Sequence, residues 1–396
     1  MSKNLLLEVK QLAAEIFPLV RDVRRHIHQH PEISFQEIQT SDFLKTKLDE
    51  AGITDKTSWV KTGILASING NDKGKTVTLR GDMDALPIQE ESSAEYKSVH
   101  HGLMHACGHD VHSACVLGAG IILNILKDKW NGKVNLLFQP GEEQLPGGAN
   151  LMLKAGIFHE NNPGKMIAQH VYPALPAGSV GFRPGRYMAS TDEIHIKIKG
   201  QGGHGALPHT VKDPVLAAAQ VIVSLQQVVS RNAQPGLHSV LSIGKVIAQG
   251  ATNVIPNEVE MQGTFRTLNE EWRAQAHELI STIIHSTCKA YGVSADVDIR
   301  KGYPVLENDV EFTHSCIEGA NEFLGPDKVH ELDIRMTAED FAWFAQQYPV
   351  CFYRLGSSSP AGEFSSSVHT STFDIDEKAL ETGIGLMAWL TLKELS

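Results

Sequence analysis

The sequence has few cysteines and no long apolar run. Its 396 residues include five cysteines, none of them in a C-x-x-C pair, so neither a disulfide framework nor a structural zinc knuckle is expected. The longest apolar runs, residues 119–126 and 215–225, are shorter than the roughly 18 residues that a membrane-spanning helix needs. The first segment carries Glu8, Lys10 and Glu15 and is too charged for the core of a signal peptide. These absences predict a cytoplasmic protein without a membrane span.

Positive charge is also in short supply. Lys and Arg number 35 against 46 Asp and Glu, which gives a net charge of −11 and argues against a surface that tracks nucleic-acid phosphates. With 42% hydrophobic and 20% charged residues, the composition is that of a globular protein. At about 150 residues per domain, the length predicts two or three domains, or one large domain with an insertion.

Strand and helix patterns alternate in the first part of the chain. Apolar residues at three- and four-residue spacing predict a helix over residues 9–27, which Pro18 should kink or divide. Ser34 and Glu37 have the spacing of a capping box, so a second helix is expected to start at Ser34. Strands are expected at 64–68, 77–79, 134–138 and 166–168, with helices near 110–127 and 148–154. This order predicts an α/β fold with a mostly parallel sheet.

The pattern changes near residue 180. Ile194, Ile196 and Ile198 alternate with polar residues, as in a half-exposed strand, and a β-α-β-β-α-β order follows. We therefore expect residues 181–300 to form a two-layer α+β domain inserted into a larger α/β domain of residues 1–180 and 301–396. Strand 193–199 could pair edge to edge in a homodimer, although its lysines act against such pairing.

Polar side chains that can bind metal follow several of the expected strands. Asp82 and Asp84 come after the second strand, the Glu142-Glu143 pair after the third and His170 at the end of the fourth, where ligands gather in open α/β sheets. Cys107 and His109 lie two residues apart between the first two groups. Each signal alone also fits a plainer role, such as a buried thiol, a turn residue or a solvated carboxylate. Their coincidence predicts a site for Zn²⁺ or Mn²⁺.

The adjacent carboxylates of Glu142 and Glu143 can have two different roles. One can bind metal while the other takes a proton from an activated water and delivers it to a leaving amine. The residues alone therefore point to metal-assisted hydrolysis of an amide.

The assembled motifs resemble the two-metal exopeptidase superfamily that includes aminoacylases, carboxypeptidase G and hippurate hydrolase. The similarity is greatest to its N-acyl amino acid amidohydrolase branch. The resemblance implies that residues 1–180 and 301–396 form a metal-binding catalytic domain and that residues 181–300 act as a lid or dimerisation domain. It runs over nearly the whole chain and rests on residues 24–32, 80–87, 104–110, 140–143, 202–209, 253–256, 263–266, 338–341 and 369–377.

The resemblance implies a role for each motif residue. It implies two divalent metal ions per subunit, Mn²⁺ or Zn²⁺ with Ni²⁺ or Co²⁺ also compatible, and Glu142 as general base and acid. Asp84 would orient a ligating histidine. The implied metal ligands are Cys107, His109, Glu143, His170 and His369, and the implied substrate-binding residues are His204, Asn253 and Arg266. His204 would act within its own subunit or across a dimer, while Asn253 equally suits a turn and Arg266 a surface ion pair.

The expected activity is hydrolysis of N-acyl amino acids, such as N-acetyl or N-benzoyl conjugates. A dipeptidase or carboxypeptidase of the same superfamily is the main alternative. A cysteine amidase would instead use Cys107 as nucleophile with His105 or His109 as its base. A third alternative is a metal-dependent binding protein without turnover. The expected partners are a small N-acyl amino acid or a short peptide and, through the inserted domain, a second copy of the chain.

Overall fold

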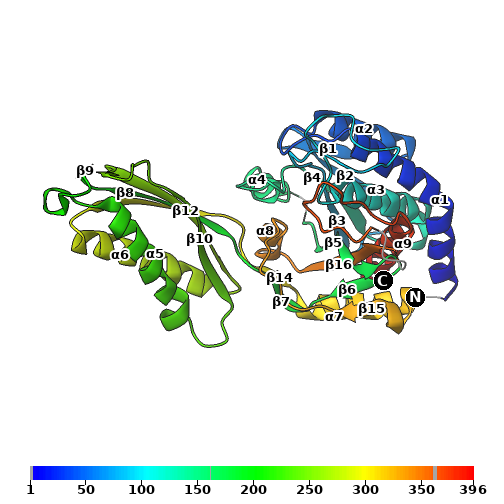
Figure 1. The fold of residues 1–396 in the computed structure, drawn as a ribbon. Coiled ribbons are helices and arrows are strands. Elements are labelled where there is room, and N and C mark those ends of the chain that lie inside the picture. The colour runs from blue at the N-terminus through cyan, green and yellow to red at the C-terminus, as the bar shows by residue number, and fades with distance from the viewer. Residues whose placement is uncertain (1–2, 161, 360–363) are drawn as a thin grey trace. The chain divides into compact units, whose positions relative to one another are not determined.

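The computed structural model describes residues 3–160, 162–359 and 364–396. The chain forms two compact units (Figure 1): unit 1 comprises Met1–Gly185, Glu307–Asp333 and Trp343–Ser396, and unit 2 comprises Arg186–Leu306 and Ile334–Ala342. The segment Ile334–Ala342 of unit 2 lies outside residues 181–300. Among the described residues, no helix has the length and apolar character needed to cross a membrane.

Unit 1 is built on an eight-stranded sheet of order β1-β2-β4-β3-β5-β16-β6-β15. The strands are β1 (Lys56–Trp59), β2 (Gly63–Asn69), β3 (Thr76–Asp82), β4 (Lys133–Gln139), β5 (Lys165–Pro176), β6 (Val180–Phe182), β15 (Val329–Glu331) and β16 (Val350–Ser358). The central strands β4, β3, β5 and β16 are all parallel, and β1 and β2 add an antiparallel edge. The predicted α/β fold with a mostly parallel sheet is confirmed.

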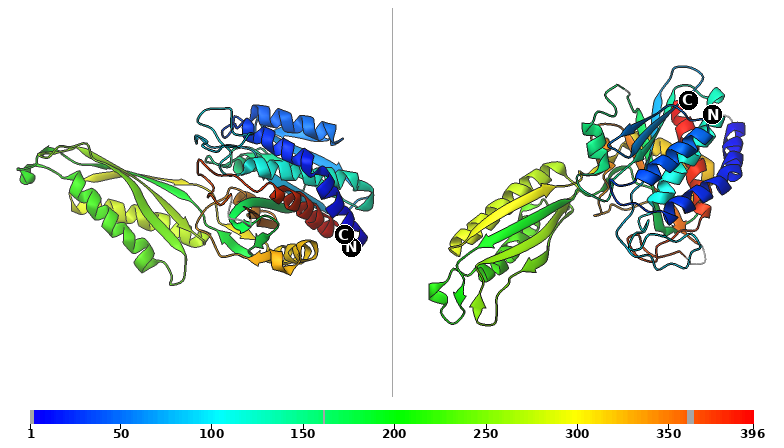
Figure 2. Two further views of the ribbon diagram at one scale, coloured as in Figure 1. Left: turned by 45° about the vertical axis from the view of Figure 1, so that its right-hand side comes forward. Right: turned by 90° about the horizontal axis from the view of Figure 1, so that it is seen from above.

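Several helices of unit 1 contact this sheet directly. The helices of the unit are α1 (Lys3–Gln29), α2 (Ile38–Glu50), α3 (His109–Ile125), α4 (Gly148–Lys154), α7 (Val310–Leu324), α8 (Ala342–Ala345, whose first residue belongs to unit 2) and α9 (Lys378–Leu395), with short 3-10 turns at Lys127–Lys129 and Pro326–Lys328. Those in direct contact with the sheet include α3, α7 and α9. Helices α1, α3 and α9 pack against one another over the sheet (Figure 2). Helix α1 runs past Pro18 without a break, so the expected division there is wrong. Pro18 lies on the exposed face, where water can bind the carbonyl oxygen that loses its N–H partner.

The start of α2 also differs from the prediction. The helix begins at Ile38, and the Glu37 side chain makes no capping bond. The first turn is capped instead by Glu32, whose carboxylate accepts hydrogen bonds from the backbone N–H groups of Gln39 and Thr40 at 3.2 and 2.9 Å. The capping box is therefore wrong, and the side chains of Ser34 and Glu37 are available for other partners.

Unit 2 contains an antiparallel sheet of order β10-β12-β8-β13, with α5 and α6 packed on one face (Figure 2). Its elements are β8 (Asp192–Lys199), α5 (Pro214–Gln227), β10 (Ser239–Ile247), β12 (Glu258–Thr267), α6 (Glu270–Ala290) and β13 (Ser294–Lys301). Short elements of unit 2 are β9 (Gly203–His204) paired with β11 (Val254–Ile255), a turn at Pro208–Thr210 and a wider helical turn at Val228–Asn232. Strands β7 (Gly185–Met188) and β14 (Leu306–Asn308) pair where the chain passes from one unit to the other.

The expectation that strand 193–199 forms a sheet edge is wrong. Strand β8 lies between β12 and β13, with registers such as Ile196 to Met261 and Ile196 to Val297. Its alternating pattern reflects one face on the core and one face in water. The sheet edges are β10 and β13.

Candidate metal centre

The structure brings the five predicted ligands together. Cys107 precedes α3, His109 opens it, Glu143 follows β4, His170 lies in β5 and His369 lies in the loop before α9. The Sγ atom of Cys107 is 3.4 Å from Nε2 of His170 and 3.3 Å from Nε2 of His369. Oε1 of Glu143 is 3.2 Å from Nε2 of His369 and 3.9 Å from Nε2 of His109. Segments far apart in the sequence thus meet at the carboxyl ends of the strands.

Two sets of donor atoms share the cysteine. Cys107, His109 and His170 form one group and Cys107, Glu143 and His369 another, each with its donor atoms within 4.8 Å of one another. This arrangement offers two neighbouring cation positions with one sulfur common to both.

Two of the histidines are oriented by backbone oxygens. Nδ1 of His109 lies 2.8 Å from the carbonyl oxygen of Asp84, and Nδ1 of His170 lies 2.8 Å from that of Val171. Because a carbonyl oxygen only accepts, each Nδ1 carries the hydrogen. The Nε2 atom of each ring therefore faces the other donor atoms, as metal-binding histidines require.

The donor set fits divalent cations. Nε2 of His109 is buried and lacks a hydrogen-bond partner among the described residues, a costly state for a polar atom, while Oε1 of Glu143 pairs with His369. Burial lowers the pKa of His109, but the neighbouring Asp82 and Cys107 outweigh it and raise the pKa well above its usual value. Burial and the charge of Glu143 raise the pKa of the Cys107 thiol. A bound cation would give Nε2 of His109 a partner and would replace the proton on that ring.

Asp84 lies beneath this centre. Its Oδ1 accepts from the N–H of Glu142 at 3.0 Å, and its Oδ2 accepts from the N–H of Glu143 at 2.9 Å and the hydroxyl of Ser34 at 2.7 Å. Burial acts to raise the pKa of Asp84, but hydrogen bonds from His109 and Ser34 outweigh it and lower the pKa. The carboxylate therefore stays charged and binds both His109, a predicted ligand, and the turn that carries the paired glutamates.

Glu142 reaches the same centre. The residue is buried, and its Oε2 atom lies 3.9 Å from Nε2 of His109. One oxygen of Glu142, one oxygen of Glu143 and a ring nitrogen of His109 lie within 4.8 Å of one another. The position allows a proton to move between Glu142 and a molecule held at the centre.

A further cluster of Asp82, His109 and His112 serves the architecture instead. Nδ1 of His112 is 2.6 Å from Oδ1 of Asp82, while the N–H of Val171 donates to Nε2 of His112 at 2.9 Å. Asp82 also pairs with the buried Arg80. Both nitrogens of His112 are therefore used, and they join α3 to β3 and to the strand of His170. No distinct sequence pattern indicated this role.

Arg24 is a second residue whose importance the sequence analysis missed. Its buried guanidinium donates to Asp110 and Asp374, each at 2.7 Å. Asp110 follows His109 directly, and Asp374 lies in the segment after His369. One side chain of α1 thus joins two segments that carry predicted metal ligands. The available signal was a charged residue beside Val20, Val23 and Ile27 on the core-facing side of the helix.

The predicted substrate-binding residues lie in unit 2 and do not form one cluster. His204 and Asn253 are adjacent, because β9 pairs with β11 and the N–H of Gly205 donates to the carbonyl oxygen of Asn253 at 2.8 Å. Arg266 lies toward the far end of β12 from β11, where it is half-buried and donates to the carbonyl oxygen of Met336 at 3.2 Å. Burial lowers the pKa of Arg266.

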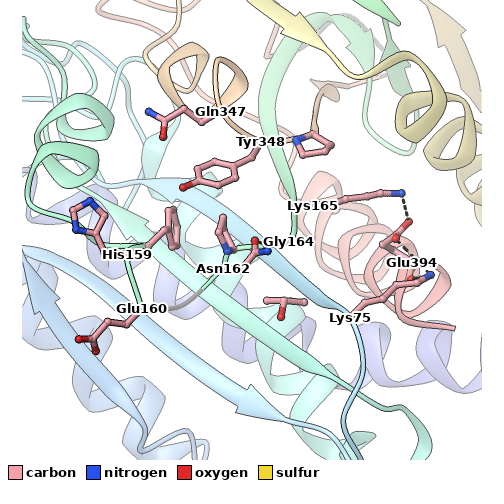
Figure 3. A pocket seen from close by; sticks show the side chains of 13 residues that line it. Lys75, His159, Glu160, Asn162, Gly164, Lys165, Gln347, Tyr348 and Glu394 are labelled. Atoms are coloured by element: carbon pink, nitrogen blue, oxygen red, sulfur yellow. Dashed lines mark hydrogen bonds and ion pairs between the residues drawn. The ribbon is translucent and has the colours of Figure 1, made fainter.

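A large surface pocket of unit 1 is separate from this centre. It has a volume of about 980 Å³ and is lined by residues that include Lys75, Lys165, Tyr348 and Glu394 (Figure 3). Thr76 and Lys165 begin β3 and β5, so the pocket lies at the amino ends of these strands, opposite the predicted ligands. An ion pair of 2.9 Å joins Lys165 and Glu394 within it.

Comparison with known proteins links this geometry to a family. The model described as peptidase family M20/M25/M40 matches residues 78–393. The N-acyl-L-amino acid amidohydrolase of Geobacillus stearothermophilus is 41% identical over 303 residues, covering 76% of this chain and 81% of its own. Thermostable carboxypeptidase 2 of Saccharolobus solfataricus is 35% identical, covering 98% of this chain and 99% of its own.

A solved structure agrees over the same length. A dinuclear metal binding peptidase of the M20 family from Bacillus subtilis superposes with a TM-score of 0.81 at 32% sequence identity, covering 96% of this chain and 99% of its own. The likeness therefore extends over both units.

Proposed function

The chain belongs to peptidase family M20/M25/M40, and from this premise we propose that it hydrolyses the amide bond of N-acyl amino acids. Membership makes it a metal-dependent amidohydrolase or peptidase. The observation that carries the finer proposal is the convergence of two donor groups on Cys107 with the Glu142 carboxylate beside them. The 41% identical amidohydrolase supports the choice of substrate class.

We assign the metal-binding role to Cys107, His109, Glu143, His170 and His369. When bound, two divalent cations would supply Lewis-acid activation of water and of the amide carbonyl. The sulfur and imidazole donors suit Zn²⁺, while Mn²⁺, Ni²⁺ and Co²⁺ remain alternatives for the test.

The remaining chemistry is assigned to side chains of this chain. An Oε atom of Glu142 takes the proton of the attacking water and passes it to the departing amino group. Asp84 holds His109 and the Glu142 turn in place by the hydrogen bonds described above. His204 would stabilise the oxyanion, and Asn253 and Arg266 would bind the substrate, Arg266 by a bidentate contact with a carboxylate.

The test uses chelator-stripped protein and a panel of N-acetyl and N-benzoyl amino acids. Free amino acid should appear only after Mn²⁺ or Zn²⁺ is restored. Glu142→Gln should keep the metal content and lose turnover, because it removes only the proton acceptor. Glu95→Gln, at an exposed carboxylate, is the matched control and should stay active. An active Glu142→Gln enzyme would refute the assignment of the base.

A peptide substrate is the second candidate, because the carboxypeptidase relative covers the chain almost completely. Dipeptides and blocked peptides in the same panel distinguish the two activities.

A cysteine nucleophile is disfavoured, since burial raises the pKa of Cys107 and His105 is absent from both donor groups of the cysteine. Turnover without metal, lost on thiol alkylation, would support it. Metal binding without any turnover would indicate a binding protein.

Dimerisation through unit 2 and a cytoplasmic location complete the proposal. Leu216 and Val223 are 55% and 65% exposed on α5, one apolar stripe at helical spacing. Sedimentation of the wild type and of a Leu216→Glu, Val223→Glu variant tests the dimer.

All five cysteines are free, which suits a reducing compartment. Cell fractionation tests the location.

A further inference from the structure

The segment before α2 is docked on the turn that carries the paired glutamates. The N–H of Gly141 donates to Oε1 of Glu37 at 2.9 Å. The ring of Phe35 occupies the space beside the α-carbon of Gly141, where a Cβ atom would come within 2.4 Å of it. Ser34 donates to Asp84, which holds the next two N–H groups of the same turn. Three successive backbone N–H groups are therefore bound by two buried carboxylates.

The docking segment is itself in an unfavourable conformation. Phe35 has a φ of +65°, a left-handed geometry that costs free energy for a residue with a bulky side chain. Glu37 is fully buried next to the charged Asp84, although burial of a carboxylate is costly. Neither feature is needed to start α2, which Glu32 already caps. Unfavourable local features that the helix does not need are typical of functional positions.

We infer that Glu37 is a positioning residue for the hydrolysis, because it fixes Gly141 and thereby the direction of the Glu142 carboxylate. This inference rests on the proposed function and adds a residue to it. Glu37 touches neither the substrate nor the predicted metals; it acts through the backbone of the turn. Gly141 has a φ of +61°, a conformation that favours glycine, so this position has no side chain that could hold the turn. Its N–H group, bound by Glu37, supplements the two N–H groups that Asp84 binds.

The hydrogen bonds of Glu37 define a rescue variant. Oε1 accepts from the N–H groups of Phe35 and Gly141, and Oε2 accepts from the Thr62 hydroxyl. In Glu37→Gln the amide oxygen keeps both backbone bonds, and the NH₂ group donates to the Thr62 oxygen, since a hydroxyl can reverse its role. Glu37→Asp shortens the side chain by one methylene and cannot reach the turn, and Glu37→Ala removes the acceptor.

Glu32→Ala is the matched control. Glu32 is also a carboxylate that binds backbone N–H groups at the start of α2, so its loss destabilises the same helix. It makes no contact with Gly141 among the hydrogen bonds of the described residues. Comparison of Glu37→Ala with Glu32→Ala therefore separates a general loss of protein stability from a loss of positioning of the Gly141 turn.

The experiment measures kcat and KM at saturating metal, metal content, and hydrogen exchange in the peptide over residues 139–147 of metal-free protein. Glu37→Ala and Glu37→Asp should lower kcat about 10- to 100-fold with little change in KM or metal content. They should also speed exchange at the turn. Glu37→Gln and Glu32→Ala should show neither effect.

Equal kcat in Glu37→Ala and Glu32→Ala would overturn the inference, as would a Glu37→Gln enzyme as impaired as Glu37→Ala. If Glu37→Ala does not fold, Glu37→Asp decides. Failure of the proposed function is distinguishable, because the wild type would then release no amino acid. In that case the exchange data on metal-free protein still decide whether Glu37 holds the turn.

Discussion

Replacing Asp84 by Asn tests how the turn below the centre is held. The two oxygens of Asp84 accept three hydrogen bonds besides facing His109, two of them from the backbone of Glu142 and Glu143. An Asn side chain has the same shape but only one accepting oxygen. Whichever way it turns, its NH₂ group faces one backbone N–H, and only the Ser34 hydroxyl can reverse to accept.

One backbone N–H without a partner costs about 1 to 3 kcal/mol. We expect the free energy of unfolding of metal-free Asp84→Asn to fall by about this amount in urea titrations at pH 5.5. Metal affinity, measured by chelator competition, should fall about 10- to 100-fold because the support of His109 is weakened. Glu37→Gln is the matched control at this pH and should unfold like the wild type. An Asp84→Asn protein of unchanged stability would refute the hydrogen-bond accounting.

Three further predictions follow from the same geometry. Burial and the charge of Asp84 raise the pKa of Glu37 to about 7; since the folded pKa exceeds the unfolded one, wild-type stability should fall as pH rises from about 5 to 8, and Glu37→Gln should lack this loss in thermal scans. A parallel decline in the variant would contradict the assignment. Arg24→Met leaves Asp110 and Asp374 without their guanidinium and should cost about 3 to 5 kcal/mol in urea unfolding; the exposed pair of Arg300 gives the control, with Arg300→Met costing less than about 1 kcal/mol. Cys107→Ser should lower occupancy of both cation positions in metal analysis, whereas His170→Ala should spare one, and equal losses would count against the shared sulfur.

The sequence was sufficient for the central sheet because its strands are short apolar runs separated by helices with regular spacing. Part of the predicted ligand set could also be inferred from the sequence, for a related reason. Parallel strands end on one side of the sheet, so Asp84, Glu143 and His170 had to converge. Nothing in that argument located His369, whose loop has no strand to align it. Its predicted place depended on the motif resemblance alone.

The errors have physical causes of the same kind. Ser34 and Glu37 have helix-capping spacing, but tertiary partners compete for their side chains, and Asp84 and Gly141 bind them instead. Strand 193–199 is polar on one face, which a strand in the middle of a sheet and a strand at its edge share. A local sequence pattern indicates which hydrogen bonds a side chain can make, whereas the tertiary structure determines which of them form.

The common sulfur of the two donor groups also sets how the centre can be damaged. Cys107 carries the one atom that belongs to both groups. Peroxide would oxidise the Cys107 sulfur in two steps, first to a sulfenic acid and then to a sulfinic acid, and the second product is not reversed by ordinary thiol reductants. Because both donor groups include this sulfur, the change would affect both proposed ion positions. An oxygen ligand at the same place would be inert to peroxide. Under the proposed assignment, the activity would therefore depend on the redox state of the surroundings, and bound metal would protect the sulfur from oxidation.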